Sequence, residues 1–226
     1  MSVLVVAAHP DDEVLGCGAT MAKLAAGGED VDVLILGEGS TSRAATRDQG
    51  DHALAERLRD DSRRAADRLG VRDVVAEGLP DNRFDTVALL DVVKLVEAQI
   101  ERRRPSMVLC QHGGDVNVDH QITFRAVLAA TRPVPGHPVR EVLAFEVGSS
   151  TEWAFGSFAP AFQPTVFEDV TDFVDAKVEA MRCYPSELRE FPHPRSPEAL
   201  RAAAARWGSA VGVPAAEAFS PVRIRR

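Results

Sequence analysis

Short apolar runs alternate with segments of helical periodicity along the first two thirds of this 226-residue chain. The first run, at residues 3–8, is apolar without interruption, which is typical of a strand buried on both faces of a sheet. Four further runs are expected to form strands, at residues 31–36, 71–75, 106–110 and 142–147. Strands that alternate with helices predict a parallel sheet covered by helices on both faces.

The helices are expected between and after these runs. Apolar residues at helical spacing mark them at residues 15–26, 54–69, 89–100 and 119–131. We therefore predict an α/β fold, a Rossmann-like three-layer sandwich with a mostly parallel sheet. HPDDE stands after the first strand where a dinucleotide-binding fold would carry GxGxxG, so a nucleotide-binding domain is disfavoured.

The last third of the chain does not continue this alternation. Five of the 13 aromatic residues lie within residues 148–168, and further helices are expected at residues 177–181 and 197–207. Since no linker separates this region from the rest, we predict a single domain over residues 1–226. A Rossmann-like core, residues 1–147, would carry an extension, residues 148–226, packed on it.

The overall charge and the cysteines exclude several classes of protein. A formal net charge of −8 disfavours nucleic acid and anionic membranes as partners. Three widely spaced cysteines without a CxxC pair indicate neither a zinc ribbon nor a disulfide framework. No signal-peptide pattern opens the chain, and no apolar run approaches the roughly 20 residues that span a bilayer. We expect a cytoplasmic protein.

A histidine and three acids, His9, Asp11, Asp12 and Glu13, follow the first strand at once. Ligands of open α/β sheets bind beyond the carboxyl ends of the strands, and a cation there would relieve the mutual repulsion of these acids. Imidazole and carboxylate groups three residues apart suit zinc, and Asp11 would stay free to accept a proton. The alternative is that the acids stabilise the N-terminus of the next helix, which leaves His9 unexplained.

A second polar cluster follows the fourth strand. The segment QHGGDVNVDH contains His112, Asp115, Asn117, Asp119 and His120, and it opens the next helix. We expect His120, in the first turn of that helix, to face the same crevice as the first cluster. A solvated loop position for His112 and a helix-capping role for Asp119 are the plainer alternatives.

These motifs resemble those of a known family. AHPDDE at residues 8–13 and DxNxDH at residues 115–120 resemble the LmbE-like, or PIG-L, family of zinc-dependent de-N-acetylases, which act on N-acetylglucosamine-type groups. Weaker similarities run along most of the chain, in GEGS, GLPDNRFD, SSTEW, FPHPRS and AEAF.

The resemblance implies a metal site and a catalytic base. His9, Asp12 and His120 would hold Zn²⁺, or another divalent metal, and Asp11 would be the general base that takes a proton from water. This assignment coincides with the interpretation of the two polar clusters from their residues.

One position departs from the family pattern. Many relatives carry a histidine where this chain has Asn117, which can donate a hydrogen bond but cannot act as an imidazolium acid. Asp115 or His112 would then share the catalytic work, and His112 is also a candidate substrate contact. Asp119 either orients a neighbouring group or caps its helix.

Further substrate contacts are expected at the same edge of the sheet. Asp81, Asn82 and Arg83 follow the third strand, although Pro-Asp-Asn is also good turn chemistry. Arg43, after GEGS, is a candidate for an anionic group of the substrate, and Trp153 for stacking on a sugar ring. The plainer alternatives are a solvated Arg43 and a Trp153 that anchors the extension.

We therefore predict a metal-dependent hydrolase that removes an acetyl group from an N-acetylated amino sugar, or a conjugate of one, by activated water. An amidase that cleaves a larger acyl group from a glucosamine conjugate is the nearest alternative. A non-catalytic carbohydrate- or metal-binding relative is the alternative of another class, and the presence of Asp11 argues against it. The expected partner is a small amino-sugar molecule; a homo-oligomer is compatible with the sequence, which specifies no oligomeric state.

Overall fold

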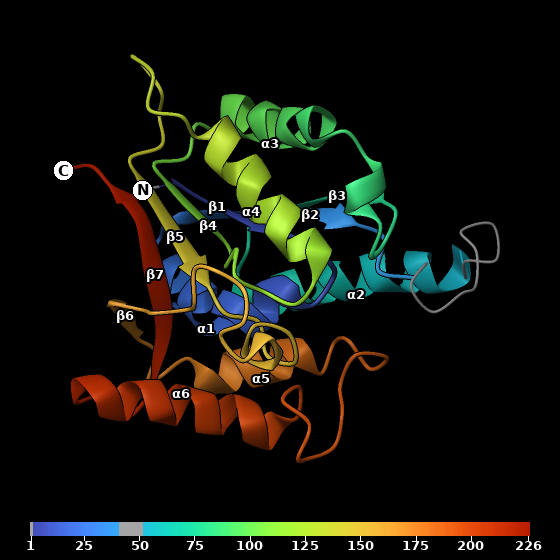
Figure 1. Cartoon of the computed structure of the whole chain (residues 1–226). Helices are drawn as coiled ribbons and strands as arrows, with labels where there is room; N and C mark the ends of the chain where they lie inside the picture. The colour runs from blue at the N-terminus through green and yellow to red at the C-terminus, as the bar shows by residue number, and fades with distance from the viewer. Residues whose placement is uncertain (1, 41–51) are drawn as a thin grey trace.

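A single mixed sheet organises the described part of the molecule, residues 2–40 and 52–226 of the computed structural model (Figure 1). Its seven strands are β1 (Ser2–Ala7), β2 (Asp30–Gly37), β3 (Asp73–Leu79), β4 (Met107–Gln111), β5 (Glu141–Phe145), β6 (Val166–Asp169) and β7 (Ala216–Ile224). They stand in the order β3-β2-β1-β4-β5-β7-β6, and the neighbours from β3 to β5 are parallel. The predicted α/β class and mostly parallel sheet are confirmed.

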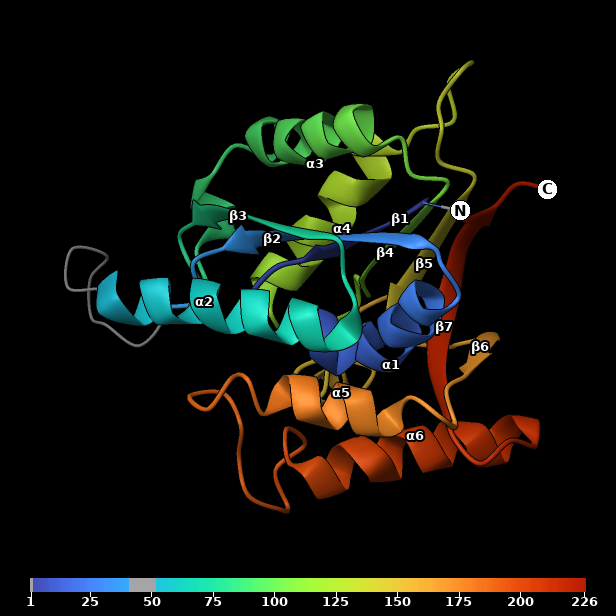
Figure 2. The same ribbon diagram turned by 180° about the vertical axis from the view of Figure 1, so that it is seen from behind.

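Helices cover both faces of this sheet (Figures 1 and 2). They are α1 (Asp12–Ala26), α2 (His52–Leu69), α3 (Leu89–Arg103), α4 (Val118–Ala130), α5 (Val174–Met181) and α6 (Pro197–Val211), with short 3-10 turns η3 (Phe84–Thr86) and η4 (Glu152–Ala154). Helices α3 and α4 lie on one face, α1, α2 and α5 on the other, and α6 packs against α5 and β7. None of the helices in the described ranges is long and apolar enough to cross a membrane.

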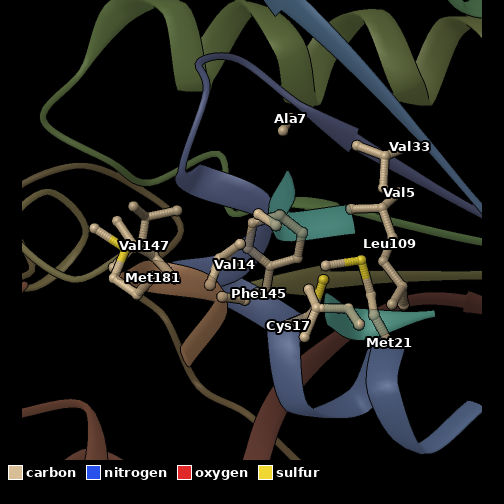
Figure 3. Close-up of a cluster of buried hydrophobic side chains, with 14 of the residues drawn as sticks. Val5, Ala7, Val14, Cys17, Met21, Val33, Leu109, Phe145, Val147 and Met181 are labelled. Carbon is tan, nitrogen blue, oxygen red and sulfur yellow. The ribbon is translucent and has the colours of Figure 1, made fainter. Parts of the chain in front are cut away.

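The hydrophobic core alternates across β1, as strand geometry requires. Val3 and Val5 belong to the cluster packed under α1, α2 and α5, whereas Leu4 and Val6 belong to the cluster under α3 and α4. Figure 3 shows part of the first cluster, with Phe145 at its centre. Burial on both faces explains the uninterrupted apolar run, and the chain leaves this buried strand directly into the polar HPDDE motif.

The C-terminal region contributes strands to the sheet, which the prediction of a packed extension did not include. β7 pairs antiparallel with β5, and β6 pairs antiparallel with β7. Pro221 hides the strand pattern of β7 in the sequence, because proline cannot donate a ladder hydrogen bond. The ladder between β5 and β7 shifts register beside Pro221, which accommodates the proline. The region of residues 148–226 therefore contributes two strands, β6 and β7, to the central sheet.

A buried ion pair also ties this region to α1. Lys177 of α5 donates to Glu217 of β7 at 2.6 Å and to the carbonyl of Leu15 at 2.8 Å. Glu217 in turn accepts the backbone N–H groups of Ala19 and Thr20 at 3.2 and 2.7 Å. The pair thus joins α5 and β7 of the extension to α1. Its contacts with α1 lie on either side of Cys17, whose backbone is not helical.

We expect Lys177→Met to lower the free energy of unfolding by about 3–5 kcal/mol, because the variant leaves the Glu217 carboxylate buried without its cation. Urea denaturation measures this loss through the transition midpoint at constant slope. The control is Arg201→Met, which removes the exposed Arg201–Asp175 pair and should change stability by less than about 1 kcal/mol. Equal effects of the two variants would contradict the structural role of the buried pair.

Candidate active site

The polar residues predicted as a site follow two neighbouring parallel strands. β1 and β4 are paired, with Val6 opposite Cys110, and the strand order reverses between them. Open α/β sheets form a ligand-binding crevice at this switch point. His9 follows β1 by two residues and His120 lies in the first turn of α4, so both side chains reach the crevice.

Three of these side chains converge on one point. Ligand atoms of His9, Asp12 and His120 all lie within 4.8 Å of one another. Asp12 Oδ2 is 3.3 Å from His9 Nδ1 and 3.3 Å from His120 Nε2. The Asp12 carboxylate is itself oriented, since the same oxygen accepts hydrogen bonds from Gln111 Nε2 at 2.7 Å and the His9 backbone N–H at 2.9 Å.

The outer nitrogen of each imidazole faces a further carboxylate. His9 Nε2 lies 2.9 Å from Asp119 Oδ2 and 3.1 Å from Asp81 Oδ1, and His120 Nδ1 lies 3.2 Å from Asp115 Oδ2. A carboxylate there fixes the tautomer that leaves the inner nitrogen's lone pair free for a metal. Asp119 therefore orients His9, which decides between the two roles considered for it.

Electrostatics at the site favour a positive charge between the two imidazoles. Burial opposes ionisation of Asp12, yet His120 and His9 hold the pKa of its carboxyl far below the usual range. Burial also disfavours the charged form of His120, but Asp12 and Asp115 raise its pKa to about 9. The pKa of His9 is likewise raised against burial, chiefly by Asp119 and Asp12.

The donor set fits a divalent cation. Two imidazole nitrogens and one carboxylate oxygen are the ligands that zinc takes in sites with an open position, and both imidazoles have their supporting carboxylates. A second group of possible ligands, His9, Asp81 and Asp119, also meets the distance criterion. The first group brings two imidazoles to one carboxylate, and each imidazole has a second carboxylate on its other nitrogen, so the first group is the stronger candidate for a metal position.

Asp11 lies beside these residues in an unusual conformation. Its backbone is left-handed, with φ 97°, which is strained for a residue other than glycine and persists only where the surroundings hold it. It occupies the N-cap position of α1 without a capping hydrogen bond from its side chain, so helix capping does not explain this residue. Burial raises the pKa of its carboxyl well above the usual range, and the Arg195 guanidinium, 2.8 Å from Asp11 Oδ2, opposes that rise.

These residues open into a cavity of about 300 Å³. Most of the predicted site residues line its wall, namely His9, Asp11, Asp81, Asn82, Asn117, His120 and Trp153. Trp153 is 45% exposed and meets the His193 ring edge-on at a centroid distance of 5.7 Å. The cavity therefore combines carboxylates, amides, imidazoles and one aromatic surface.

Asn117 is held at both ends of its amide. Its Oδ1 accepts the Asp119 backbone N–H at 2.8 Å, which makes Asn117, and not Asp119, the N-cap of α4. Its Nδ2 donates to Asn82 Oδ1 at 3.1 Å. An amide nitrogen carries two hydrogens, so one remains for a group in the cavity.

Several expected site residues lie elsewhere. Asp115 is fully buried behind His120 and accepts hydrogen bonds from Ser150 and Thr151, so it does not reach the cavity. His112 is turned to the extension, with Nε2 2.7 Å from the Pro160 carbonyl and its ring against Phe124 and Phe162. The Pro160 segment can approach this closely because Gly114 has no Cβ to collide with it.

Two predicted arginines remain to be placed. Arg83 precedes the 3-10 turn η3 and is not part of the cavity wall, although its neighbours Asp81 and Asn82 are. Asn82 has a left-handed backbone, with φ 53°, and is the last residue of this segment in the cavity wall. Arg43 lies outside the described residues.

Other lining residues came from segments that carried no recognised chemical motif. Ser149 and Ser150 follow β5, while Glu187, Arg189 and Arg195 belong to the segment between α5 and α6. The only signals in the sequence were the SSTEW and FPHPRS segments, which point to the family without assigning a role to any residue.

The chain is similar to known deacetylases in sequence. The sequence model of the family PIG-L, described as GlcNAc-PI de-N-acetylase, matches residues 4–131. Diacetylchitobiose deacetylase of Thermococcus kodakarensis is 28% identical over 193 residues, which cover 83% of this chain and 70% of that protein.

Solved structures share the fold. The conserved protein TT1542 of Thermus thermophilus superposes with a TM-score of 0.76 at 27% identity, over 99% of this chain and 96% of that one. GalB of Pseudomonas putida, a 4-carboxy-2-hydroxymuconate hydratase, gives a TM-score of 0.76 at 23% identity, over 100% and 97% of the two chains. The second likeness concerns the fold alone, since one fold can host different reactions.

We expect Asn117→Ala to lower the free energy of unfolding by about 1 kcal/mol, because the first turn of α4 loses its cap. Asn117→Asp keeps an oxygen that accepts the Asp119 N–H and should retain most of that stability. Urea denaturation of the three proteins measures the difference. Equal stability of Asn117→Ala and the unaltered protein would remove the capping role.

Proposed function

This chain belongs to the PIG-L family of GlcNAc-PI de-N-acetylases, and on that premise we propose that it is a zinc-dependent hydrolase of N-acetylated amino sugars. The substrate is an N-acetylglucosamine-type group, free or in a conjugate, and the products are acetate and the free amine. One observation carries the proposal: His9, Asp12 and His120 converge from two strand ends, and Asp11 lies beside them without being needed as a ligand.

His9, Asp12 and His120 would hold the cation. When bound, a divalent metal supplies Lewis acidity, which lowers the pKa of water and stabilises developing negative charge. Zinc is the proposed metal because two imidazoles and a carboxylate are common zinc ligands; another divalent ion is the alternative. Asp115 and Asp119 would keep His120 and His9 in the tautomer and orientation that binding requires.

Asp11 would act as the general base and then as the acid. Its carboxylate takes a proton from water as the water oxygen attacks the amide carbonyl carbon. The same proton then passes to the amide nitrogen as the C–N bond breaks, so that the sugar leaves as an amine. Asn117 Nδ2 has a hydrogen available to donate toward the carbonyl oxygen as that oxygen gains negative charge.

The cavity suits a sugar better than a long acyl chain. A volume of about 300 Å³ is at the lower end for ligand pockets. Asp81 and Asn82 offer hydrogen-bonding groups for hydroxyls, and Trp153 offers a face for the apolar side of a pyranose ring. The diacetylchitobiose deacetylase relative acts, by its name, on an N-acetylated sugar of this kind.

Two other functions remain as alternatives with separate outcomes. An amidase for larger acyl groups would release amine from N-butanoyl or longer analogues faster than from the acetyl compound. A non-catalytic carbohydrate- or metal-binding protein would bind zinc and sugar without turnover. We place the enzyme in the cytoplasm with a small-molecule partner and without nucleic acid or membrane, in keeping with its net charge of −8.

The central test is amine release from a panel of N-acetylglucosaminides with zinc and with a chelator. We expect zinc-dependent release by the unaltered protein and a loss of about 10²–10⁴-fold in kcat for Asp11→Asn, which keeps a side chain that tolerates the left-handed backbone. Zinc content of Asp11→Asn should equal that of the unaltered protein. Equal turnover by this variant would refute the base assignment, and absence of release by the unaltered protein on every sugar would refute the deacetylase proposal.

Metal affinity tests the ligands and their supports. We expect His120→Ala to lose stoichiometric zinc, and Asp115→Asn to bind zinc about 10–100-fold more weakly, because its contact with His120 Nδ1 is impaired. Competition with a chromogenic chelator measures both. Glu146→Gln is the control, since its carboxylate pairs with Trp207 Nε1 outside this site and the variant should bind zinc normally. Unchanged stoichiometry in His120→Ala would remove that residue from the ligand set.

A further inference from the structure

Arg195 joins three loops of the cavity at Asp11. Its Nη1 donates to Asp11 Oδ2 at 2.8 Å and to Glu187 Oε2 at 3.0 Å, and its Nε donates to Ser149 Oγ at 2.8 Å. Asp11 follows β1, Ser149 follows β5, and the other two residues lie between α5 and α6. One side chain thus connects the proposed base to a segment 184 residues further along the chain.

Burial makes this geometry specific. The side chains of Asp11 and Glu187 are 2% and 8% exposed, and that of Arg195 is 23% exposed. A carboxylate out of water needs a charged or hydrogen-bonding partner, and a guanidinium presents its donors in a rigid planar fork. With Nε and Nη1 both engaged, the fork cannot rotate without losing its bond to Ser149 or to the carboxylates.

The charges argue against Arg195 as a binding site for an anionic part of the substrate. Two carboxylates, those of Asp11 and Glu187, contact its one guanidinium, so the three groups together carry a formal charge of −1. A further anion would be repelled by this group at short range. The contacts of Arg195 therefore indicate that it holds Asp11 and Glu187 in place and does not bind the substrate.

Asp11 needs such a neighbour, because its left-handed backbone is held against intrinsic strain. We infer that Arg195 is a positioning residue, which engages Asp11 Oδ2 and so presents the other oxygen, Oδ1, to the reacting water. This inference rests on the proposed function of Asp11 as the base. Arg195 acts through Asp11 and has no direct contact with the reacting atoms.

The first test is steady-state kinetics of Arg195→Ala and Arg195→Lys in the amine-release assay. We expect Arg195→Ala to lose about 10²-fold in kcat, the loss typical of a catalytic group displaced by about 1 Å, with little change in KM or zinc content. Arg195→Lys should also be impaired, since one ammonium cannot replace both Nε and Nη1. Guanidinium ion, at concentrations too low to unfold the protein, should restore part of the kcat of Arg195→Ala in a saturable way.

Arg201→Ala is the matched control, because this exposed arginine of α6 pairs with Asp175 outside the cavity. Its kcat should be unchanged, and guanidinium should not increase it. A purely structural role for Arg195 would lower zinc content and stability together with kcat, and added guanidinium would not rescue the activity. Arg195→Ala with unaltered kcat would overturn the inference.

A double-mutant cycle with Asp11→Asn shows whether Arg195 acts through Asp11. We expect Arg195→Ala to cost little kcat in the Asp11→Asn background, and the two changes to be non-additive in the free energy of unfolding of the zinc-free protein as well. Additive effects in both measurements would overturn the inference. If the unaltered protein releases no amine, the proposed function fails, whereas the stability cycle still reports whether Arg195 and Asp11 are coupled.

Discussion

Buried negative charge beside two imidazoles is the constraint on which the rest of this structure depends. Asp12, Asp115 and Asp119 are at most 1% exposed, and ionised carboxylates are tolerated at such depth only with hydrogen bonds and positive charge around them. The ends of the strands supply hydrogen bonds. Gln111, the last residue of β4, donates to Asp12, and Thr151, after β5, donates to Asp115 at 2.7 Å. The loops at this edge are therefore shaped by the need to satisfy the site.

The C-terminal region supplies much of what that site requires. Its strand β7 pairs with β5 inside the sheet, and the Lys177–Glu217 pair holds α1, which starts at the HPDDE motif. Ser150 donates to Asp115 behind His120, and Arg195 contacts Asp11, the proposed base. A core that ended at β5 would keep His9, Asp12, His120 and their carboxylate neighbours, but it would lack the hydroxyls that hold Asp115 and the arginine that contacts Asp11. Fold and site are thus built by the same segments, which explains why no linker divides the chain.

Local sequence pattern is sufficient to predict the strands that carry the candidate site and the convergence of His9, Asp12 and His120 beyond them. An uninterrupted apolar run that ends in polar residues reports a buried strand and the loop at its carboxyl end, which is how His9 and its neighbours are found. Partners that are distant in the chain leave no such pattern, and Arg195 is one of them. His112 has the residue type and the position of a site residue, yet its ring packs on Phe162, because periodicity does not encode the direction of a loop side chain. Strand β7 is also hard to predict from the sequence, because Pro221 interrupts its pattern. The register shift that accommodates this proline depends on the neighbouring strand β5.

The asparagine at position 117 changes how protons move in the proposed reaction. An amide can stabilise a developing oxyanion with its remaining N–H but cannot transfer a proton, so the proton that reaches the leaving amine is the one Asp11 took from water. A single carboxylate then acts twice, and its position has to be kept through both transfers, because a displacement of about 1 Å costs on the order of 10²-fold in rate. Fixed contacts meet that demand: Arg195, which contacts Asp11, is held by Ser149 and Glu187. In the same cavity wall, Asn117 is held by hydrogen bonds on both sides of its amide. Rigid surroundings thus compensate for the missing imidazole by keeping the one remaining acid–base group in place.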